Sequence, residues 1–483
     1  MPAETETGSL YSAPVAFVYI FNLIIGVGAL TMPKAFASAG WVIAVVLTGV
    51  LCLMSFITAT FMIEAMAAAN AFLRLKTEDK SLSIPPQTLS NSEEDRPLLI
   101  NNVNEDQAPG LYDITRKVEM GQMADLFFSK IGVRLFYFCI ALYLYGDLAI
   151  YAAAVPKSLT QIACDQLQSI SKTAKQTEKR RKIASPPNTA QIYCRCLTLI
   201  FCCLQAIFAV TLGPFTFFNV QKTKYLQIFT SFMRWMAFIM MIVLAIMRII
   251  KYKPRHNTPA ADFSGLPNLF GVCVYSYMCQ HSIPSLITPL KNKSRVTQLF
   301  FADFAIVLVF YSLLSFTAIF AFRVEELKDL YTLNFWGNSG KFAGYFLALF
   351  PVFTLSTNFP IISITLRDNL KNLFYREGSP YPWVVDRIVF PLVTITLPIA
   401  VAFITQNLEI LVGVTGSYAG AGVQYVIPAC LAYCGRKKII ELTGYYDNKH
   451  TSPFGNRWWI MFVIGWAVVC IAFVTANHII TRK

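Results

Sequence analysis

The most constraining stretch of this chain is an apolar run from Tyr19 to Phe36 that contains strong helix breakers. Its sequence, YIFNLIIGVGALTMPKAF, is apolar enough for a lipid bilayer, yet it includes Gly26, Gly28 and Pro33. Glycine costs about 1 kcal/mol relative to alanine inside a helix, and proline about 3 kcal/mol. Backbone groups freed by a break cannot face lipid, so the break must be buried in protein or line a polar cavity. We therefore predict an interrupted membrane helix of the kind with which transporters hold a solute.

Composition indicates an all-α polytopic membrane protein. Of the 483 residues, 55% are hydrophobic and only 14% are charged, whereas soluble domains are about 25% charged. The net charge of +14 comes from Lys and Arg in short connections, where they set topology and meet lipid headgroups, so no nucleic acid partner is expected. About 20 apolar residues cross the hydrocarbon core, which gives about eleven spans. The predicted spans are 14–37, 41–70, 133–163, 191–213, 225–250, 266–290, 298–322, 342–366, 386–405, 408–433 and 457–479.

The distribution of basic residues predicts a cytosolic N-terminal tail, 1–13, before a transmembrane domain that covers 14–483. The cluster KRRK after the third span and the string KYKPRH after the fifth oppose this orientation. The polar insertion 71–120 is rich in Ser, Asn, Pro, Asp and Glu, which predicts a largely disordered cytosolic loop. The glycosylation sequon at Asn292 also falls in the cytosol, so we expect it to stay unmodified.

A second span with helix breakers lies five spans after the first. Span 266–290 contains Pro284 and Pro289, with Gln280 and His281 near its middle. Paired interruptions at matching positions of two halves indicate an inverted-repeat transporter. A repeat of five plus five helices with one extra helix accounts for eleven spans.

These segments resemble the amino acid/auxin permease family. The pattern N-x-x-x-G-x-G-A-L-x-M-P-x-A-F-A-x-A-G over 22–40 is similar to the family's first helix, and 270–284 and 354–367 are similar to its sixth and eighth. The strings EMGQMADLFF, YLYGDLAIYAAAVP, GPFTFF, QKTKYLQI and YPWVVDR resemble the transmembrane protein 104 group of that family. The family includes sodium-coupled, proton-coupled and lysosomal amino acid transporters. The resemblance implies a LeuT-like 5+5 fold with broken helices 1 and 6, an outward C-terminus and an amino acid site at the two breaks.

Two groups of residues are candidates for that substrate site, one at each break. The candidates are Gly26, Val27, Gly28, Ala29, Tyr275, Cys279, Gln280 and His281. The alternative for the glycines is close packing between helices, which small residues also permit. His281 is either a proton-coupling group, since imidazole ordinarily titrates near pH 6.5, or a hydrogen-bond partner of a neighbouring helix.

The coupling ion, Na+ or H+, has a second set of candidate residues, and no other cofactor or metal is expected. Asn22 aligns with an asparagine that resembles a sodium ligand of the neutral amino acid transporters. Oxygen donors that would join it are Ser356, Thr357 and Asn358. The alternative is ordinary interhelical hydrogen bonding, worth roughly 0.6 kcal/mol per pair. Lys34 and Asp147 depart from the family pattern, and as an ion pair they would fill the cation's place or form a proton-responsive gate.

No motif of an enzyme is present in the sequence: it has no G-x-x-x-x-G-K-[ST], no H-E-x-x-H and no G-x-S-x-G. We therefore expect a secondary active transporter of amino acids or similar small zwitterions that works by alternating access. The alternative is a non-transporting sensor that binds an amino acid and signals through the loop 71–120.

Two further features concern the cellular address. Glu94, Leu98 and Leu99 fit an acidic dileucine pattern, which resembles the sorting signal read by clathrin adaptors and favours a lysosomal or endosomal membrane. The alternatives are that these leucines pack against the bundle and that the protein resides in the plasma membrane. Cys164 and one of the pair Cys194 and Cys196 fall on the same side of the membrane, so they form either a disulfide or separate thiols.

Overall fold

The computed structural model of the chain describes residues 10–82, 110–179, 189–214, 224–252, 259–337, 340–374 and 381–481. Side chains are not described at 78–82, 164–179, 189–199, 224–228 and 481. The sorting motif of Glu94, Leu98 and Leu99 lies outside the described residues, as do the side chains of Cys164, Cys194 and Cys196.

The described chain is built from helices, which follow one another with short connections. In chain order they are α1 (Ala13–Ile24), α2 (Val27–Ala39), α3 (Trp41–Leu82), α4 (Met120–Phe127), α5 (Lys130–Lys179), α6 (Thr189–Leu212), α7 (Lys224–Tyr252), α8 (Leu266–Tyr277), η4 (Gln280–Ser282), α9 (Ile283–Ile287), α10 (Val296–Ala321), η5 (Val324–Glu326), η6 (Tyr331–Phe335), α11 (Lys341–Leu373), η7 (Val385–Val389), α12 (Phe390–Ile404), α13 (Leu408–Thr415), η8 (Gly416–Gly420), η9 (Gly422–Val426), α14 (Ile427–Thr443) and α15 (Arg457–Thr481).

These helices confirm the predicted fold class. Within the described residues, eight helical segments are long and apolar enough to cross a membrane, and the bent pair α1 and α2 makes a ninth. The two members of that pair meet at 55°. A second interrupted segment runs from α8 through η4 into α9, and α6 has an apolar part over Ile200–Leu212. In chain order, these segments match the eleven predicted spans.

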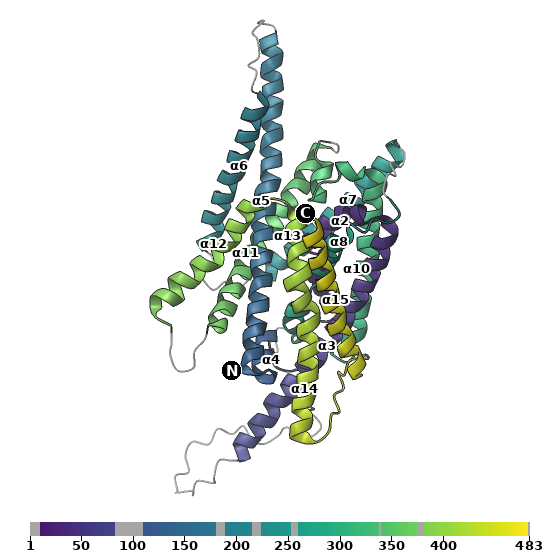
Figure 1. Cartoon of the computed structure of the whole chain (residues 1–483), viewed down its shortest axis with the longest axis vertical. Coiled ribbons are helices and arrows are strands. Elements are labelled where there is room, and N and C mark those ends of the chain that lie inside the picture. The colour runs from purple at the N-terminus through teal and green to yellow at the C-terminus, as the bar shows by residue number, and fades with distance from the viewer. Residues whose placement is uncertain are drawn as a thin grey trace.

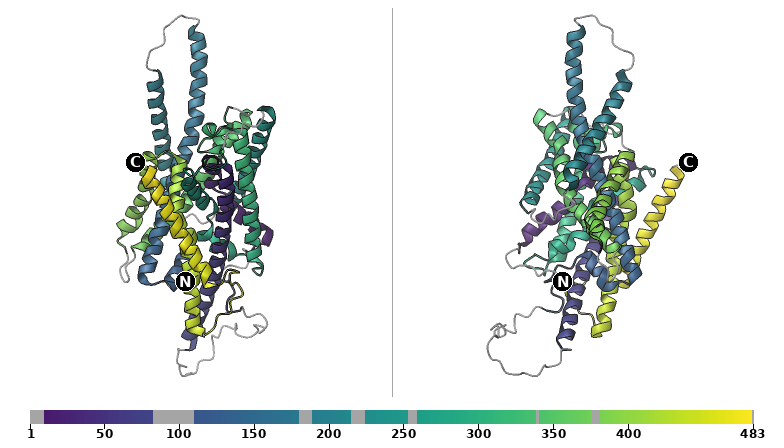
Figure 2. Two further views of the ribbon diagram at one scale, coloured as in Figure 1. Left: turned by 45° about the vertical axis from the view of Figure 1, so that its right-hand side comes forward. Right: turned by 90° about the vertical axis from the view of Figure 1, so that its left-hand side faces the viewer.

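The helices form an upright bundle in which α2 and α8 lie near the middle (Figure 1). The described chain begins toward the lower end, just before α1, and ends toward the upper end with α15, as an odd number of crossings requires (Figure 2). At the upper end, α5 and α6 extend side by side beyond the bundle. The 50 residues of α5 are about 75 Å long at 1.5 Å per residue, more than twice the thickness of a hydrocarbon core of about 30 Å.

The polar insertion predicted over 71–120 is structured at both of its ends. Helix α3 continues to Leu82, and the chain at 110–119 packs back against it. The Asn70 side chain accepts from the backbone of Thr115 and Arg116 at 3.2 and 2.9 Å. The Arg74 guanidinium donates to the carbonyl of Asp113 at 2.8 Å. The insertion is therefore anchored to α3 on the side of the bundle where the chain begins.

Small residues let the interrupted helices approach their neighbours closely. A Cβ added at Gly271 of α8 would lie 1.9 Å from the carbonyl oxygen of Gly413 in α13. One added at Gly28 of α2 would lie 2.2 Å from Oγ of Ser276 in α8. Contacts between small residues are the usual basis of tight helix packing in membranes, where lipid offers no hydrophobic drive for association. Gly28 therefore lies at a close packing contact between α2 and α8, which is the alternative given for the glycines above.

Candidate transport site

The two helix breaks lie side by side in the middle of the bundle. The first separates α1 from α2 at Ile25 and Gly26, and the second follows α8 at Met278 and Cys279. The hydroxyl of Tyr311 on α10 lies 3.2 Å from the Ile24 carbonyl oxygen and 3.0 Å from that of Ser276. A single side chain thus touches freed carbonyls of both interrupted helices.

A cavity of about 490 Å³ opens beside these breaks. It is lined by α1, α5, α7, α9 and α11 together with the breaks themselves. The predicted candidates on its wall are Asn22, Gly26, Val27, Asp147, Tyr275, His281 and Asn358. Its volume falls in the range of about 300–1,000 Å³ that is usual for small-molecule sites.

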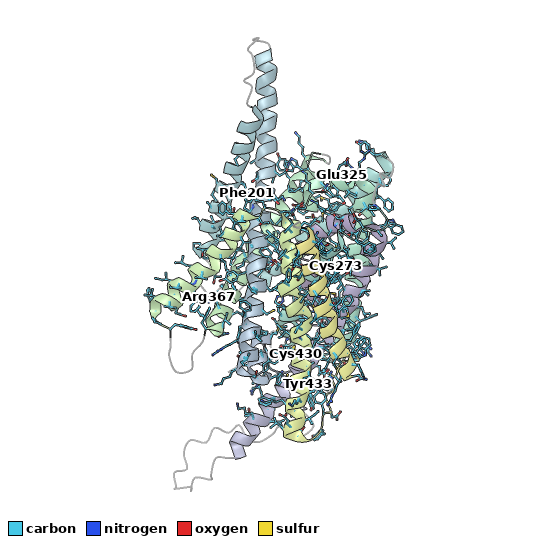
Figure 3. All side chains as sticks on the ribbon, in the orientation of Figure 1. Phe201, Cys273, Glu325, Arg367, Cys430 and Tyr433 are labelled. Atoms are coloured by element: carbon cyan, nitrogen blue, oxygen red, sulfur yellow. The ribbon has the colours of Figure 1, made fainter. Side chains whose placement is uncertain are left out.

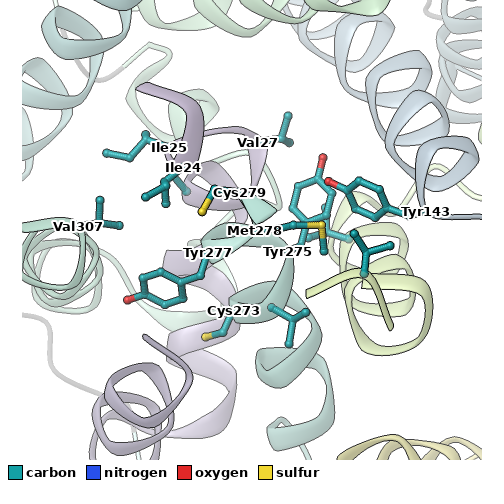
Figure 4. Close-up of a cluster of buried hydrophobic side chains, with 14 of the residues drawn as sticks. Ile24, Ile25, Val27, Tyr143, Cys273, Tyr275, Tyr277, Met278, Cys279 and Val307 are labelled. Atoms are coloured by element: carbon teal, nitrogen blue, oxygen red, sulfur yellow. The ribbon is translucent and has the colours of Figure 1, made fainter. Parts of the chain in front are cut away.

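One wall of the cavity joins a carboxylate to aromatic rings. Asp147 of α5 is 6% exposed, and it accepts a hydrogen bond from the Tyr275 hydroxyl. The Tyr143 ring lies 6.3 Å from that of Tyr275 and 5.7 Å from the His281 imidazole, between ring centroids. Figure 4 shows Tyr143 and Tyr275 together on one side of α8, with Tyr277 pointing away from them. A carboxylate beside aromatic faces is a favourable setting for an ammonium group.

The cavity also carries polar atoms that lack protein partners. No side chain caps the N-terminus of α2, which begins at Val27 beside the cavity. The buried atoms Asn22 Oδ1 and His281 Nδ1 have no hydrogen-bond partner among the described residues. Buried polar atoms are normally satisfied, so these groups are placed to receive a polar ligand, and a helix N-terminus favours a negatively charged one.

Several predicted site residues face away from the cavity. The Gln280 amide donates to the Ser55 carbonyl at 3.2 Å and to the Thr58 hydroxyl at 3.1 Å, both on α3. The Thr357 hydroxyl donates to the Thr354 carbonyl of its own helix at 2.9 Å. Because successive residues of a helix are rotated by about 100°, neighbours of a lining residue face other helices. The predicted residues that do not line the cavity are Gly28, Ala29, Cys279, Gln280, Ser356, Thr357 and Lys34.

Lys34 does not pair with Asp147. Its Nζ lies 2.5 Å from Oδ1 of Asp329 and 3.4 Å from Oε2 of Glu409. The other carboxylate oxygen of Asp329 lies 2.7 Å from Nζ of Lys157. We refer to Lys34, Lys157, Asp329 and Glu409 as the four-charge cluster. The predicted pair fails because a nearer carboxylate comes from the connection between α10 and α11, which the sequence does not place beside α2.

The four-charge cluster ties α2, α5 and α13 to the connection between η5 and η6. Figure 3 places Glu325 of η5, next to this connection, near the upper end, and Tyr433 of α14 near the lower end. Burial tends to raise the pKa of Asp329, but the ammonium groups of Lys157 and Lys34 outweigh it and lower that pKa below its ordinary value. Asp329 is therefore ionised near neutral pH, and the cluster joins the elements at the upper end of the bundle.

Arg234 of α7 is a site residue that sequence reasoning missed. It is 8% exposed, lines the cavity and donates to the backbone carbonyl of Asn22. The signal was its position within the apolar string FMRWMAF, because a charge inside a membrane span usually faces a functional cavity. Tyr143 and Tyr151 also line the cavity, but aromatic residues are too common in this chain for the sequence to single them out.

Comparisons with known proteins agree with this architecture. The family model described as transmembrane amino acid transporter protein matches residues 113–476. The chain is 54% identical to transmembrane protein 104 of Homo sapiens over 501 residues, which cover 99% of this chain and 98% of that protein. It is 39% identical to a homolog from Drosophila melanogaster, with 98% of each chain covered. Among solved structures, the transporter MhsT in complex with L-phenylalanine superposes with a TM-score of 0.51 and 12% identity, over 97% of this chain and 99% of that one. The arrangement of broken helices is thus that of the LeuT-like fold.

Proposed function

Because the chain belongs to the transmembrane amino acid transporter family, we propose that it is a secondary active transporter of amino acids or similar small zwitterions. The observation that carries this proposal is the cavity at the two breaks, which is lined by a carboxylate and by an uncapped helix N-terminus. A zwitterion needs both kinds of group. We infer that its ammonium is bound by Asp147 and the neighbouring tyrosines, and its carboxylate by the free N–H groups at the start of α2.

Alternating access is the working mechanism that we propose. On the side of the breaks where the chain begins, the residues that line the cavity belong to α1, η4 and α9. On the other side, the four-charge cluster joins α2, α5 and α13 to the connection after α10. Opening toward the upper end would require these ion pairs to separate. The energy comes from an Na+ or H+ gradient in this proposal, in which no step requires ATP hydrolysis.

Uptake into liposomes by the purified full-length chain tests this proposal. We expect at least one radiolabelled amino acid to accumulate above empty liposomes when pH and sodium gradients are imposed. Asp147→Asn should reduce that uptake at least tenfold, since it keeps the shape of the side chain and removes its charge. Glu441→Gln is the matched control, because Glu441 is 57% exposed on α14, and it should stay within twofold of the wild type. Amino acid binding without flux would contradict transport and favour the sensor alternative.

We further propose a lysosomal or endosomal address, through clathrin adaptors that bind the motif of Glu94, Leu98 and Leu99. The support is the pattern itself and its position in the insertion that is anchored at the end where the chain begins. Replacing Leu98 and Leu99 with alanine should move tagged protein from lysosomes to the cell surface. An unchanged distribution would show that this motif is not the address.

A further inference from the structure

The carbonyl end of α1 is largely occupied by donors from the protein itself. The last four residues of a helix have carbonyls without partners inside the helix, here those of Phe21 to Ile24. The Phe21 carbonyl accepts from the backbone N–H of Ile25 at 3.1 Å. The Asn22 carbonyl accepts from the Arg234 guanidinium, and the Ile24 carbonyl lies 3.2 Å from the Tyr311 hydroxyl. Few oxygens at this break are therefore left to coordinate an ion.

Arg234 brings a fixed positive charge to this carbonyl end. Its guanidinium is nearly enclosed, and no described carboxylate lies within 4 Å of it. A buried cation is costly unless something compensates it. The carbonyl end of a helix supplies that compensation, because it is the negative end of the helix dipole. The charge of Arg234 is thus satisfied by the backbone of the broken helix and not by an acidic side chain.

The position of this charge is fixed by packing. The next residue, Trp235, stacks on the Phe21 ring with centroids 4.2 Å apart and planes 14° apart. Phe21 directly precedes Asn22, so the stacked pair lies one residue away from the hydrogen bond on both helices. The Phe310 ring of α10 meets Phe21 edge-on at 5.9 Å. These contacts hold α7 against α1 and keep the guanidinium opposite the break.

Ion-coupled transporters use freed carbonyls at such a break to coordinate Na+. A sodium ion placed about 4 Å from a guanidinium would be repelled by about 4 kcal/mol at an effective dielectric constant of 20. We propose that Arg234 permanently takes the place of the coupling cation at the carbonyl end of α1, so that the transporter binds its amino acid without sodium. This inference rests on the proposed transport function. It removes Asn22 and the oxygen donors Ser356, Thr357 and Asn358 from the role of sodium ligands.

Ligand affinity and thermal stability of the purified full-length chain test the proposal in sodium chloride and in choline chloride of equal ionic strength. We expect the dissociation constant of a bound amino acid to agree within twofold between the two salts. Sodium should also leave the melting temperature of the ligand-free protein unchanged within 1 °C. A tenfold tighter affinity in sodium, or stabilisation of the ligand-free chain by sodium, would overturn the proposal.

Variants at position 234 separate this role from direct binding of the substrate. Arg234→Gln removes the charge, so it should lower the melting temperature of the ligand-free protein by several degrees and weaken binding at least tenfold in choline chloride. Arg234→Lys keeps the charge and should restore most of both losses. Lys251→Gln is the control, because it removes a positive charge from the exposed end of the same helix and should change neither.

Two outcomes lead to other conclusions. If Arg234→Gln leaves the ligand-free protein as stable as the wild type but abolishes binding, Arg234 binds the substrate carboxylate and the proposal is wrong. If no amino acid binds in either salt, the proposed transport function fails. The response of the ligand-free melting temperature to sodium and to Arg234→Gln still decides the role of Arg234 in that case.

Discussion

Glu64 on α3 shows how a single charge can be placed deep in this bundle. It is fully buried, and its two carboxylate oxygens accept from the Arg436 guanidinium at 2.5 and 2.7 Å. The Tyr446 hydroxyl and the Ser452 backbone N–H also donate to it, at 2.8 and 2.9 Å. A buried ion pair tolerates the loss of one partner poorly, because the other charge is then left without compensation.

We therefore expect Glu64→Gln to destabilise the protein by about 3–5 kcal/mol. Replacing both Glu64 and Arg436 with leucine should recover much of that loss, since no buried charge then remains. Glu441→Gln, which affects an exposed pair with Lys437, should change stability by less than about 1 kcal/mol. Chemical unfolding in detergent measures all three. A Glu64→Gln variant as stable as the wild type would show that Arg436 finds compensation elsewhere.

Asp329 gives the four-charge cluster a defined response to pH. Lys157 and Lys34 lower its pKa below the ordinary value, against the opposite effect of burial. A carboxylate with a lowered folded-state pKa contributes stability that is present above its unfolded pKa and is lost as the pH falls through the folded one. The stabilisation should therefore be complete at pH 7.5 and at pH 5, and should decline only below about pH 4.

The difference in melting temperature between the wild type and Asp329→Asn measures this contribution. It should be constant from pH 7.5 to pH 5 and should shrink as the pH falls below 4. Asp368→Asn serves as the control, because Asp368 is 54% exposed. A difference that already vanishes between pH 7 and pH 5 would contradict the lowered pKa of Asp329.

At the scale of the helices, the two glycines near the first break have different surroundings. A Cβ at Gly26 would meet nothing within 4 Å, whereas one at Gly28 would lie 2.2 Å from Oγ of Ser276 and 2.8 Å from its Cα. The second clash involves backbone, so a change of rotamer does not relieve it. Gly26 thus borders open space in the cavity, and Gly28 is a contact point between α2 and α8.

Leucine at position 26 should therefore abolish ligand binding while the protein keeps its melting temperature, because the side chain fills the cavity. Alanine at position 28 should lower the melting temperature by several degrees, because α2 and α8 must separate. Gly465→Ala on α15 is the control for the second variant, since its added Cβ would also meet nothing within 4 Å. If Gly28→Ala and Gly465→Ala have the same melting temperature, then α2 and α8 can separate at Gly28 without a loss of stability, and this prediction is wrong.

The helices were more predictable from the sequence than their contacts. Apolar runs and the breakers Gly26, Pro33 and Pro284 located the spans and both interruptions, because these signals act within one turn or two. The partner of Lys34 lies 295 residues away along the chain, and no local pattern indicates it. Arg234 carried a usable signal, a charge inside an apolar span, but its role depends on α7 lying against α1.

At the scale of the whole molecule, the fold predicts opposite exposure of its two sets of connections. Asn292, between α9 and α10, and Glu325, after α10, are both exposed and lie at either end of the same span. With a cytosolic N-terminus, Asn292→Cys should react with an impermeant maleimide only from the cytosolic side of sealed vesicles, and Glu325→Cys only from the other side. The wild type supplies the background of native cysteines. If both variants react from the same side, α10 does not cross the membrane and the prediction is wrong.

The hydroxyl of Tyr311 adds a consequence for how the two halves of the fold can move. It stands within hydrogen-bond reach of carbonyls from both interrupted helices, at Ile24 and at Ser276, yet a phenol has only one hydrogen to give. The two breaks therefore compete for one proton, and a bond lost by one helix is regained by the other. Parting the breaks then costs less than a full hydrogen bond, which is worth about 0.5–1.5 kcal/mol. The hydrogen bonds of Tyr311 therefore add little to the energy of separating the two breaks.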